Sequence, residues 1–195
     1  GYWLANPAWI AAGKIRPDTA WRPWRVSPTG YLHELAGNIG AGDRVVHLSD
    51  GGHIENLGIY SLLRRRCRLI IAIDAEEDAA MSFGALGDLI RFARMDMAIQ
   101  IDIDLDHVRR IGKPAEDGLS RDHMAIGEID YGDASDKGLF VYLKSSLTGD
   151  EGEALRKYKA IEPAFPHHPT MGDQFYDEEQ FEAYRSLGYH IADQA

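Results

Sequence analysis

The chain has 195 residues, of which 45% are hydrophobic and 27% are charged, a composition typical of a globular protein and not of a disordered or fibrous one. Its 21 basic and 31 acidic side chains give a formal net charge of −10, which argues against a nucleic-acid partner because phosphate binding requires a cationic face. A single cysteine, Cys67, excludes an internal disulfide and favours a reducing compartment, and no apolar run approaches the ~20 residues that cross a bilayer.

Residues 1–44 predict an irregular segment that covers a sheet formed elsewhere in the chain. This stretch contains all four tryptophans and four prolines, but it has little clean periodicity. The sequence begins with Gly1, and core-type side chains follow within the next few residues. We therefore expect the chain to be a piece of a longer protein.

Two apolar runs with a helical stretch between them predict a β-α-β unit over residues 44–74. The first strand, at 44–48, ends at Ser49-Asp50-Gly51-Gly52. The second, at 69–74, is nearly all apolar, as expected of a strand buried on both faces. The stretch 59–66 between them ends in arginines, which suit the C-terminal end of a helix dipole. This spacing predicts two parallel neighbouring strands.

The remaining elements follow from hydrophobic periodicity. Apolar residues at intervals of three and four predict helices, and alternation of apolar with polar residues predicts strands with one face toward solvent. The predicted helices span 83–97, 151–161 and 177–191, and the predicted strands span 99–105, 125–131 and 139–144. The turn-rich stretch 132–138 joins the last two strands as a hairpin. The sequence thus predicts an α/β fold over 45–195, with a mainly parallel sheet flanked by helices and an antiparallel edge hairpin.

Asp50 is the candidate catalytic residue because it stands where an apolar strand ends and the chain turns. In open α/β sheets, functional groups collect at the carboxyl ends of the strands. Gly51 and Gly52 permit backbone angles that other residues avoid and let another chain or a ligand approach closely. A carboxylate held in this way suits a general base. An Asp-Gly turn without chemistry has the same pattern, so spacing alone leaves both interpretations open.

The residues around Asp50 resemble a known family. The block Ser49-Asp50-Gly51-Gly52-His53, followed by Asn56-Leu57, resembles the Asp-Gly-Gly region of patatin-like phospholipases. It is most similar to that of the large bacterial patatin-like proteins and of the cytosolic phospholipase branch. The resemblance covers roughly residues 30–192 and is most specific over 44–100.

This resemblance implies a partial three-layer patatin-like fold and serine–aspartate dyad chemistry without a cofactor or metal. Asp50 would be the dyad aspartate, and Gly51 and Gly52 would shape the turn that presents it. From their residue types, His53 and Asn56 are expected to support that turn. Residues 1–195 would then be the C-terminal portion of one acyl hydrolase domain that acts on glycerolipid or other ester substrates, in the cytoplasm or peripherally at the cytoplasmic face of a membrane.

The chain departs from this family because it lacks the serine half of the dyad. None of its nine serines lies in a Gly-x-Ser-x-Gly elbow, and Ser120, which follows Gly118, has Asp122 where the second glycine belongs. The family's glycine-rich oxyanion loop is also missing. We therefore expect the partner to be an upstream part of the same protein that carries both features, and the chain alone to be inactive. The alternative is a catalytically inactive patatin-derived module retained for interaction or scaffolding.

Two clusters allow a metal-binding interpretation. Asp50, His53 and Glu55 are close in sequence and could bind a divalent ion, but no second pair at ligand spacing accompanies them, so no metal is expected there. The three aspartates within 102–106 are interpreted as the polar face of one strand.

Two further polar features concern the strand at 69–74 and the C-terminal part of the chain. Asp74 ends the strand after the one that leads to Asp50, which gives it a candidate supporting role. The histidines at 167–168 are flanked by prolines and predict an exposed loop.

Overall fold

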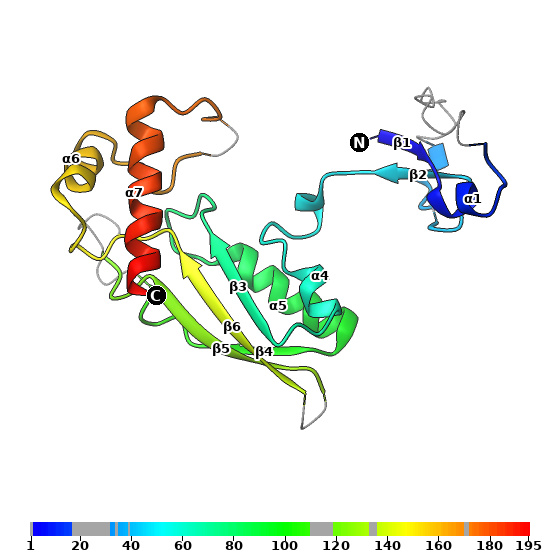
Figure 1. The fold of residues 1–195 in the computed structure, drawn as a ribbon, viewed down its shortest axis with the longest axis horizontal. Coiled ribbons are helices and arrows are strands. Elements are labelled where there is room, and N and C mark those ends of the chain that lie inside the picture. The colour runs from blue at the N-terminus through cyan, green and yellow to red at the C-terminus, as the bar shows by residue number, and fades with distance from the viewer. Residues whose placement is uncertain are drawn as a thin grey trace. The chain divides into compact units, whose positions relative to one another are not determined.

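In the computed structural model the chain forms two compact units, Gly1–Ile54 and Glu55–Ala195, each described by itself (Figure 1). The structure describes residues 2–16, 32–33, 35–38, 40–109, 119–132, 136–169 and 172–195. Part of the predicted covering segment, including Trp21 and Trp24, lies outside the described residues. Within the described ranges, no helix has both the length and the apolar character that a membrane crossing requires.

The first unit is built on a two-stranded antiparallel sheet. Strand β1 (Tyr2–Ala5) pairs with β2 (Val45–Leu48), so that Trp3 lies opposite His47. The short helix α1 (Pro7–Ala11) begins after Asn6, whose side chain accepts a hydrogen bond from the Ala8 amide at 2.9 Å.

The strand predicted at 44–48 is confirmed, but the predicted β-α-β unit is wrong. Strand β2 finds its hydrogen-bonding partner in β1 and not in the strand at 69–74. Spacing along the chain cannot identify the partner, because any strand in extended conformation can satisfy the backbone groups of β2.

The second unit contains a four-stranded mixed sheet in the order β3-β6-β5-β4 (Figure 1). The strands are β3 (Leu69–Asp74), β4 (Gln100–Ile103), β5 (Met124–Asp130) and β6 (Lys137–Lys144). The α/β class is confirmed, and so is the antiparallel pairing of β5 with β6, but this hairpin lies in the middle of the sheet and not at its edge as predicted. The sheet is mixed and not mainly parallel: in the described residues β3 with β6 is the parallel pair, whereas β4–β5 and β5–β6 are antiparallel.

One face of this sheet packs against helices α4 (Tyr60–Arg64) and α5 (Gly84–Met97). The predicted apolar stripe of the helix at 83–97 is confirmed, because Leu86, Leu89 and Ala93 are buried. They contact a core to which the strands contribute Ile70 and Phe140. Amphipathic periodicity therefore placed this helix and its buried face correctly.

The opposite face of the sheet carries an exposed apolar band. We use this name for Leu69, Ile71, Ile73, Ile126 and Leu139. The three β3 members are exposed to 56%, 54% and 73%, although their sequence predicted burial on both faces. That prediction is wrong for the described residues. The described helices cover one face of β3 only, and the side chains on its other face remain exposed.

Helices α6 (Glu153–Ile161) and α7 (Glu178–Gln194) lie side by side and form a second core beyond the ends of β3 and β6 (Figure 1). Helix α7 begins at Asp177, whose side chain accepts a hydrogen bond from the Gln180 amide at 2.8 Å, as a favourable N-cap does. The expected exposure of residues 167–168 is wrong. His168 is buried against Tyr184 of α7, whose hydroxyl lies 2.8 Å from its Nδ1. The adjacent His167 is also buried.

Gly127 on β5 lies where β4 and β5 approach most closely. A Cβ at this position would lie 2.5 Å from the carbonyl oxygen of Asp102 and 2.8 Å from the Cβ of Ile103. Because those atoms belong to the paired strand β4, Gly127→Ala should lower the free energy of unfolding by about 2–3 kcal/mol, as overpacking of a core does. Urea unfolding followed by circular dichroism measures this change.

Gly87 in α5 provides the matched control. A Cβ there would meet nothing within 4 Å, and alanine in a helix interior is more favourable than glycine by about 0.5–1 kcal/mol. Gly87→Ala should therefore stabilise the protein. Equal stability of the two variants would contradict the close approach at Gly127.

Candidate functional site

Asp50 lies directly after β2 and caps the 3-10 turn η1 (Gly51–His53). Its Oδ1 accepts a hydrogen bond from the Gly52 amide at 2.9 Å, and the residue is exposed. The backbone amide of His53 donates to the Asp50 carbonyl at 3.2 Å and closes the turn. The sequence thus placed this carboxylate correctly at the end of a strand, and the turn orients it without burying it.

Gly51 leaves one side of this turn open. Its backbone does not adopt the left-handed conformation, and a Cβ added to it would meet nothing within 4 Å. Neither the turn geometry nor internal packing therefore requires glycine at this position. Glycine at this position leaves the turn open to close approach by another group.

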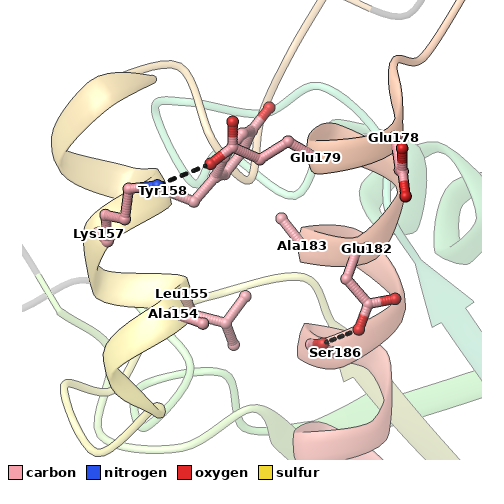
Figure 2. Close-up of a pocket in the computed structure, with 9 residues that line it drawn as sticks. All are labelled: Ala154, Leu155, Lys157, Tyr158, Glu178, Glu179, Glu182, Ala183 and Ser186. Atoms are coloured by element: carbon pink, nitrogen blue, oxygen red, sulfur yellow. Dashed lines mark hydrogen bonds and ion pairs between the residues drawn. The ribbon is translucent and has the colours of Figure 1, made fainter.

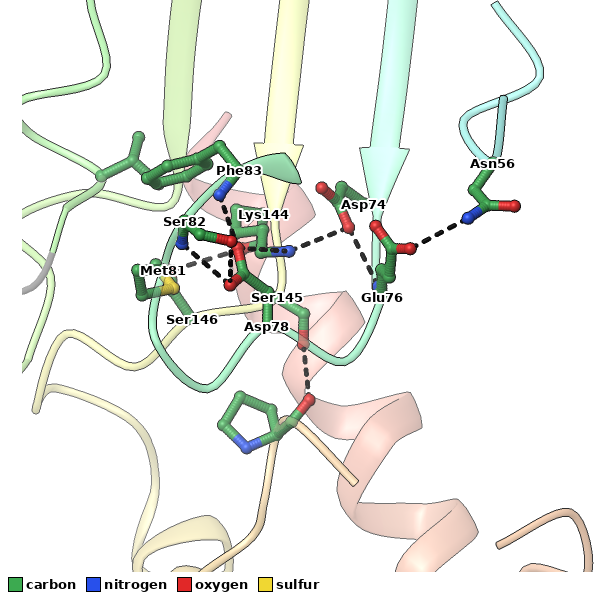
Figure 3. A network of polar contacts seen from close by, with 12 residues as sticks. Asn56, Asp74, Glu76, Asp78, Met81, Ser82, Phe83, Lys144, Ser145 and Ser146 are labelled. Atoms are coloured by element: carbon green, nitrogen blue, oxygen red, sulfur yellow. Dashed lines mark hydrogen bonds and ion pairs between the residues drawn. The ribbon is translucent and has the colours of Figure 1, made fainter. Parts of the chain in front are cut away.

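Two residues that follow this turn in the sequence, Glu55 and Asn56, make separate contacts in the second unit. Asn56 donates from Nδ2 to Glu76 at 3.0 Å, so it bonds to the loop that follows β3 (Figure 3). Both carboxylate oxygens of Glu55 accept hydrogen bonds from the Ile59 amide, and one of them also accepts from Tyr60. Glu55 therefore caps the start of α4, a structural use that differs from metal binding.

The aspartates at 102–106 also have the structural role that the sequence predicted. All three are exposed, and Asp104 accepts a hydrogen bond from the Asp106 amide at 2.9 Å where the chain turns after β4. Their alternation therefore marks the polar side of a strand and its following turn.

A buried polar cluster lies at the carboxyl ends of the parallel strands β3 and β6 (Figure 3). The Lys144 ammonium is 2.9 Å from Asp74 and 3.9 Å from Asp78, and its side chain is fully buried. The hydroxyl of Tyr142 donates a hydrogen bond to the second oxygen of Asp74. Asp74, which sequence suggested as a supporting residue, thus compensates a buried positive charge.

Asp78 connects this cluster to the start of α5. It accepts hydrogen bonds from the amides of Ser82 at 2.8 Å and Phe83 at 2.7 Å. Burial favours the neutral carboxylic acid, but these hydrogen bonds and the charge of Lys144 outweigh it and lower the pKa of Asp78. Burial and the hydrogen bond to Asp74 raise the pKa of Tyr142, so the phenol stays protonated. Because the groups are closed to solvent, this cluster holds the fold together and cannot meet a substrate.

A serine and a histidine are in contact in the same region, yet they cannot form a nucleophilic pair. The Oγ atom of Ser146 lies 2.8 Å from Nδ1 of His123. Ser146 is only 2% exposed and His123 only 1%, so an acyl carbonyl cannot reach the hydroxyl. This contact could not be predicted from the sequence, because neither residue lies in a motif.

Two of the cavities in the second unit are lined by described residues. The larger has a volume of about 800 Å³, and its lining includes Glu151, Arg156 and Lys159. The smaller, of about 440 Å³, lies between α6 and α7 (Figure 2). Its rim carries the ion pair of Lys157 with Glu179, at 3.2 Å, on exposed side chains. Such a solvated rim is ordinary helix surface.

Among the described residues, four side chains that could hold a metal ion are ones that sequence spacing missed. His123, Asp150, Glu151 and His190 have donor atoms that all lie within 4.8 Å of one another. They come from three separate parts of the second unit, so no short motif in the sequence could reveal them.

The chemistry of the site must be inferred from the residues themselves. No family model, no curated protein and no solved structure matches this chain. Asp50 is the candidate catalytic group on the strength of its sequence context and its exposed position after β2. The four candidate metal ligands form a separate set in the second unit.

Proposed function

We propose that this chain is the aspartate-bearing part of a lipid acyl hydrolase, in which Asp50 pairs with a serine that lies outside the chain. The observation that carries the proposal is the exposed carboxylate at the end of β2, held by the Gly52 amide at 2.9 Å. A general base must come within about 2.6–3.2 Å of the proton that it accepts, and it must do so in a fixed orientation. The carboxylate of Asp50 is oriented by the turn and is accessible, which supports its use as such a base.

The chemistry assigned to Asp50 is proton transfer in two steps. In the first, Asp50 accepts the serine hydroxyl proton while the serine oxygen attacks the ester carbonyl, and the proton then passes to the leaving alcohol. In the second, Asp50 accepts a proton from water, whose oxygen attacks the acyl-serine, and the fatty acid leaves as the serine regains its proton. No cofactor takes part in either step.

The exposed apolar band supports the proposal that a further layer of protein covers this face of the sheet. Contiguous exposed apolar patches larger than a few hundred Å² are rare on monomeric proteins and mark contact surfaces. We assign this surface to the upstream part of the same protein, which would also bring the serine and the oxyanion loop. The substrates are glycerolipid or other esters, met in the cytoplasm or by peripheral contact at the cytoplasmic face of a membrane.

The function is tested by comparing this chain with a longer form of the protein that includes the upstream region. We expect the longer form to hydrolyse a short-chain ester and to be labelled by a fluorophosphonate at a Gly-x-Ser-x-Gly serine. The 195-residue chain should show neither activity nor labelling, because a base without its nucleophile is not a catalyst. An upstream region without that elbow, or a longer form that is never labelled, would favour the inactive scaffold module instead.

A further inference from the structure

Four side chains from three distant segments converge beside helix α7. His123 precedes β5, Asp150 and Glu151 lie in the loop after β6, and His190 lies on α7. One donor atom from each of the four lies within 4.8 Å of the others. Imidazole nitrogens and carboxylate oxygens together are the ligands that zinc and related transition metals prefer.

The donor atoms have nearly the spacing that a metal site requires. In a tetrahedral zinc site with bonds of about 2.0–2.1 Å, neighbouring ligand atoms lie about 3.3 Å apart. Nε2 of His190 is already 3.1 Å from Oδ1 of Asp150. Asp150 is exposed and His190 is half-buried, so side-chain rotations of these two residues can bring the wider pairs together.

The contacts of His123 orient its ring as a ligand. Its Nδ1 lies 2.8 Å from the Oγ of Ser146, which can donate in turn to the Lys144 carbonyl at 3.3 Å. With Ser146 bonded in this way, Nδ1 carries the proton and Nε2 is left with its lone pair. Nε2 faces the cluster, 3.2 Å from the hydroxyl of Thr148. A hydrogen bond on the second ring nitrogen is the usual support of a metal-binding histidine.

The charges of the cluster suit a divalent cation. The carboxylate of Asp150 accepts hydrogen bonds from the hydroxyl of Thr148 at 2.5 Å and from Nε2 of Gln194 at 2.9 Å. Glu151 is held in place by the amides of Thr148 at 2.6 Å and Gly149 at 2.9 Å, and its oxygens keep further lone pairs.

We propose that His123, Asp150, Glu151 and His190 bind one Zn²⁺ ion that ties α7 to the loop after β6. Two imidazoles favour zinc over Ca²⁺ and Mg²⁺, which prefer all-oxygen sites. Four protein ligands fill a tetrahedral zinc ion, and closed sites of this kind are structural. The proposal replaces the expectation of no metal, which considered the cluster at Asp50 and the aspartates at 102–106, and it does not depend on the hydrolase function.

The experiment uses the full 195-residue chain, purified without a histidine tag and stripped of metal by EDTA. Titration with ZnCl₂ should show one equivalent bound per chain, with a dissociation constant in the micromolar range or tighter, and excess ZnCl₂ should raise Tm by about 5 °C or more. Co²⁺ in place of Zn²⁺ should give the visible absorption of a tetrahedral nitrogen–oxygen site. Absence of stoichiometric zinc binding, or binding of Ca²⁺ in preference to Zn²⁺, would overturn the proposal.

Variants test which side chains hold the ion. His190→Gln and Asp150→Asn should each weaken zinc binding by at least 100-fold. Ser146→Ala keeps all four ligands and should weaken binding by about 10–100-fold, the usual effect of losing the support of a ligand. His47→Gln removes an imidazole from the first unit and should leave affinity unchanged. Circular dichroism checks that each variant is folded, and zinc affinity that is equal in all four variants would contradict the assigned site.

Discussion

In the proposed longer protein that carries the serine, replacing Asp50 with asparagine should lower kcat/KM for ester hydrolysis by about 10²–10⁴, the usual contribution of a general base. Asparagine keeps the shape of the side chain but cannot accept the serine proton at neutral pH. It is also a good N-cap, so the Oδ1 contact with Gly52 and the turn should survive. Steady-state hydrolysis of a short-chain ester measures the effect, and an unchanged Tm shows that the loss is chemical.

Asp43 offers a matched control for this substitution. It is an exposed aspartate in the same unit, and its Oδ2 likewise accepts a backbone hydrogen bond, from Gly40 at 2.8 Å. Asp43→Asn should leave the rate unchanged within a factor of two or so, since no proton transfer is assigned to it. A near-normal rate for Asp50→Asn in a folded protein would remove Asp50 from the mechanism.

Replacing Asp74 with alanine should lower the free energy of unfolding by about 3–5 kcal/mol, because it leaves the ammonium of Lys144 buried without its nearest counter-charge. Asp78 remains, but it lies 3.9 Å from that nitrogen, compared with 2.9 Å for Asp74. The hydroxyl of Tyr142 also loses its acceptor. Urea unfolding of the 195-residue chain gives the loss directly.

An exposed pair on the same sheet shows how much of that effect is due to burial. Lys137 and Glu128 form an ion pair with side chains 49% and 57% exposed, and Glu128→Gln should leave the stability nearly unchanged because solvent screens the pair. The double variant Asp74→Leu with Lys144→Met should recover most of the stability lost in Asp74→Ala, because apolar residues of similar volume replace the pair. A loss below about 1 kcal/mol in Asp74→Ala would show that the buried charge is compensated in another way.

Local pattern predicted much of the second unit. The helix expected at 83–97 is α5, the strand expected at 69–74 is β3, and the turn-rich stretch at 132–138 does join two antiparallel strands. These predictions succeed because helix and strand periodicity are properties of neighbouring residues. The position of Asp50 after a strand could be predicted for the same reason.

Contacts between distant segments could not be predicted in this way. Sequence spacing assigned β2 to the same sheet as β3, whereas it pairs with β1. It also left residues 167–168 exposed, although Tyr184 on α7 packs against His168. In both cases the residue that decides the outcome lies far away along the chain, and pairing between distant residues leaves no trace in local periodicity.

By itself, the sequence determined the order and the approximate extent of the helices and strands in the second unit, and it placed an aspartate with two glycines after β2. Only the tertiary structure decided which strands pair, that Asp74 and Lys144 share a buried ion pair, and that two histidines and two carboxylates converge near α7. The physical reason is that secondary structure follows from interactions within a few residues. A site assembled from His123, Asp150 and His190 exists only once the sheet and α7 have packed together.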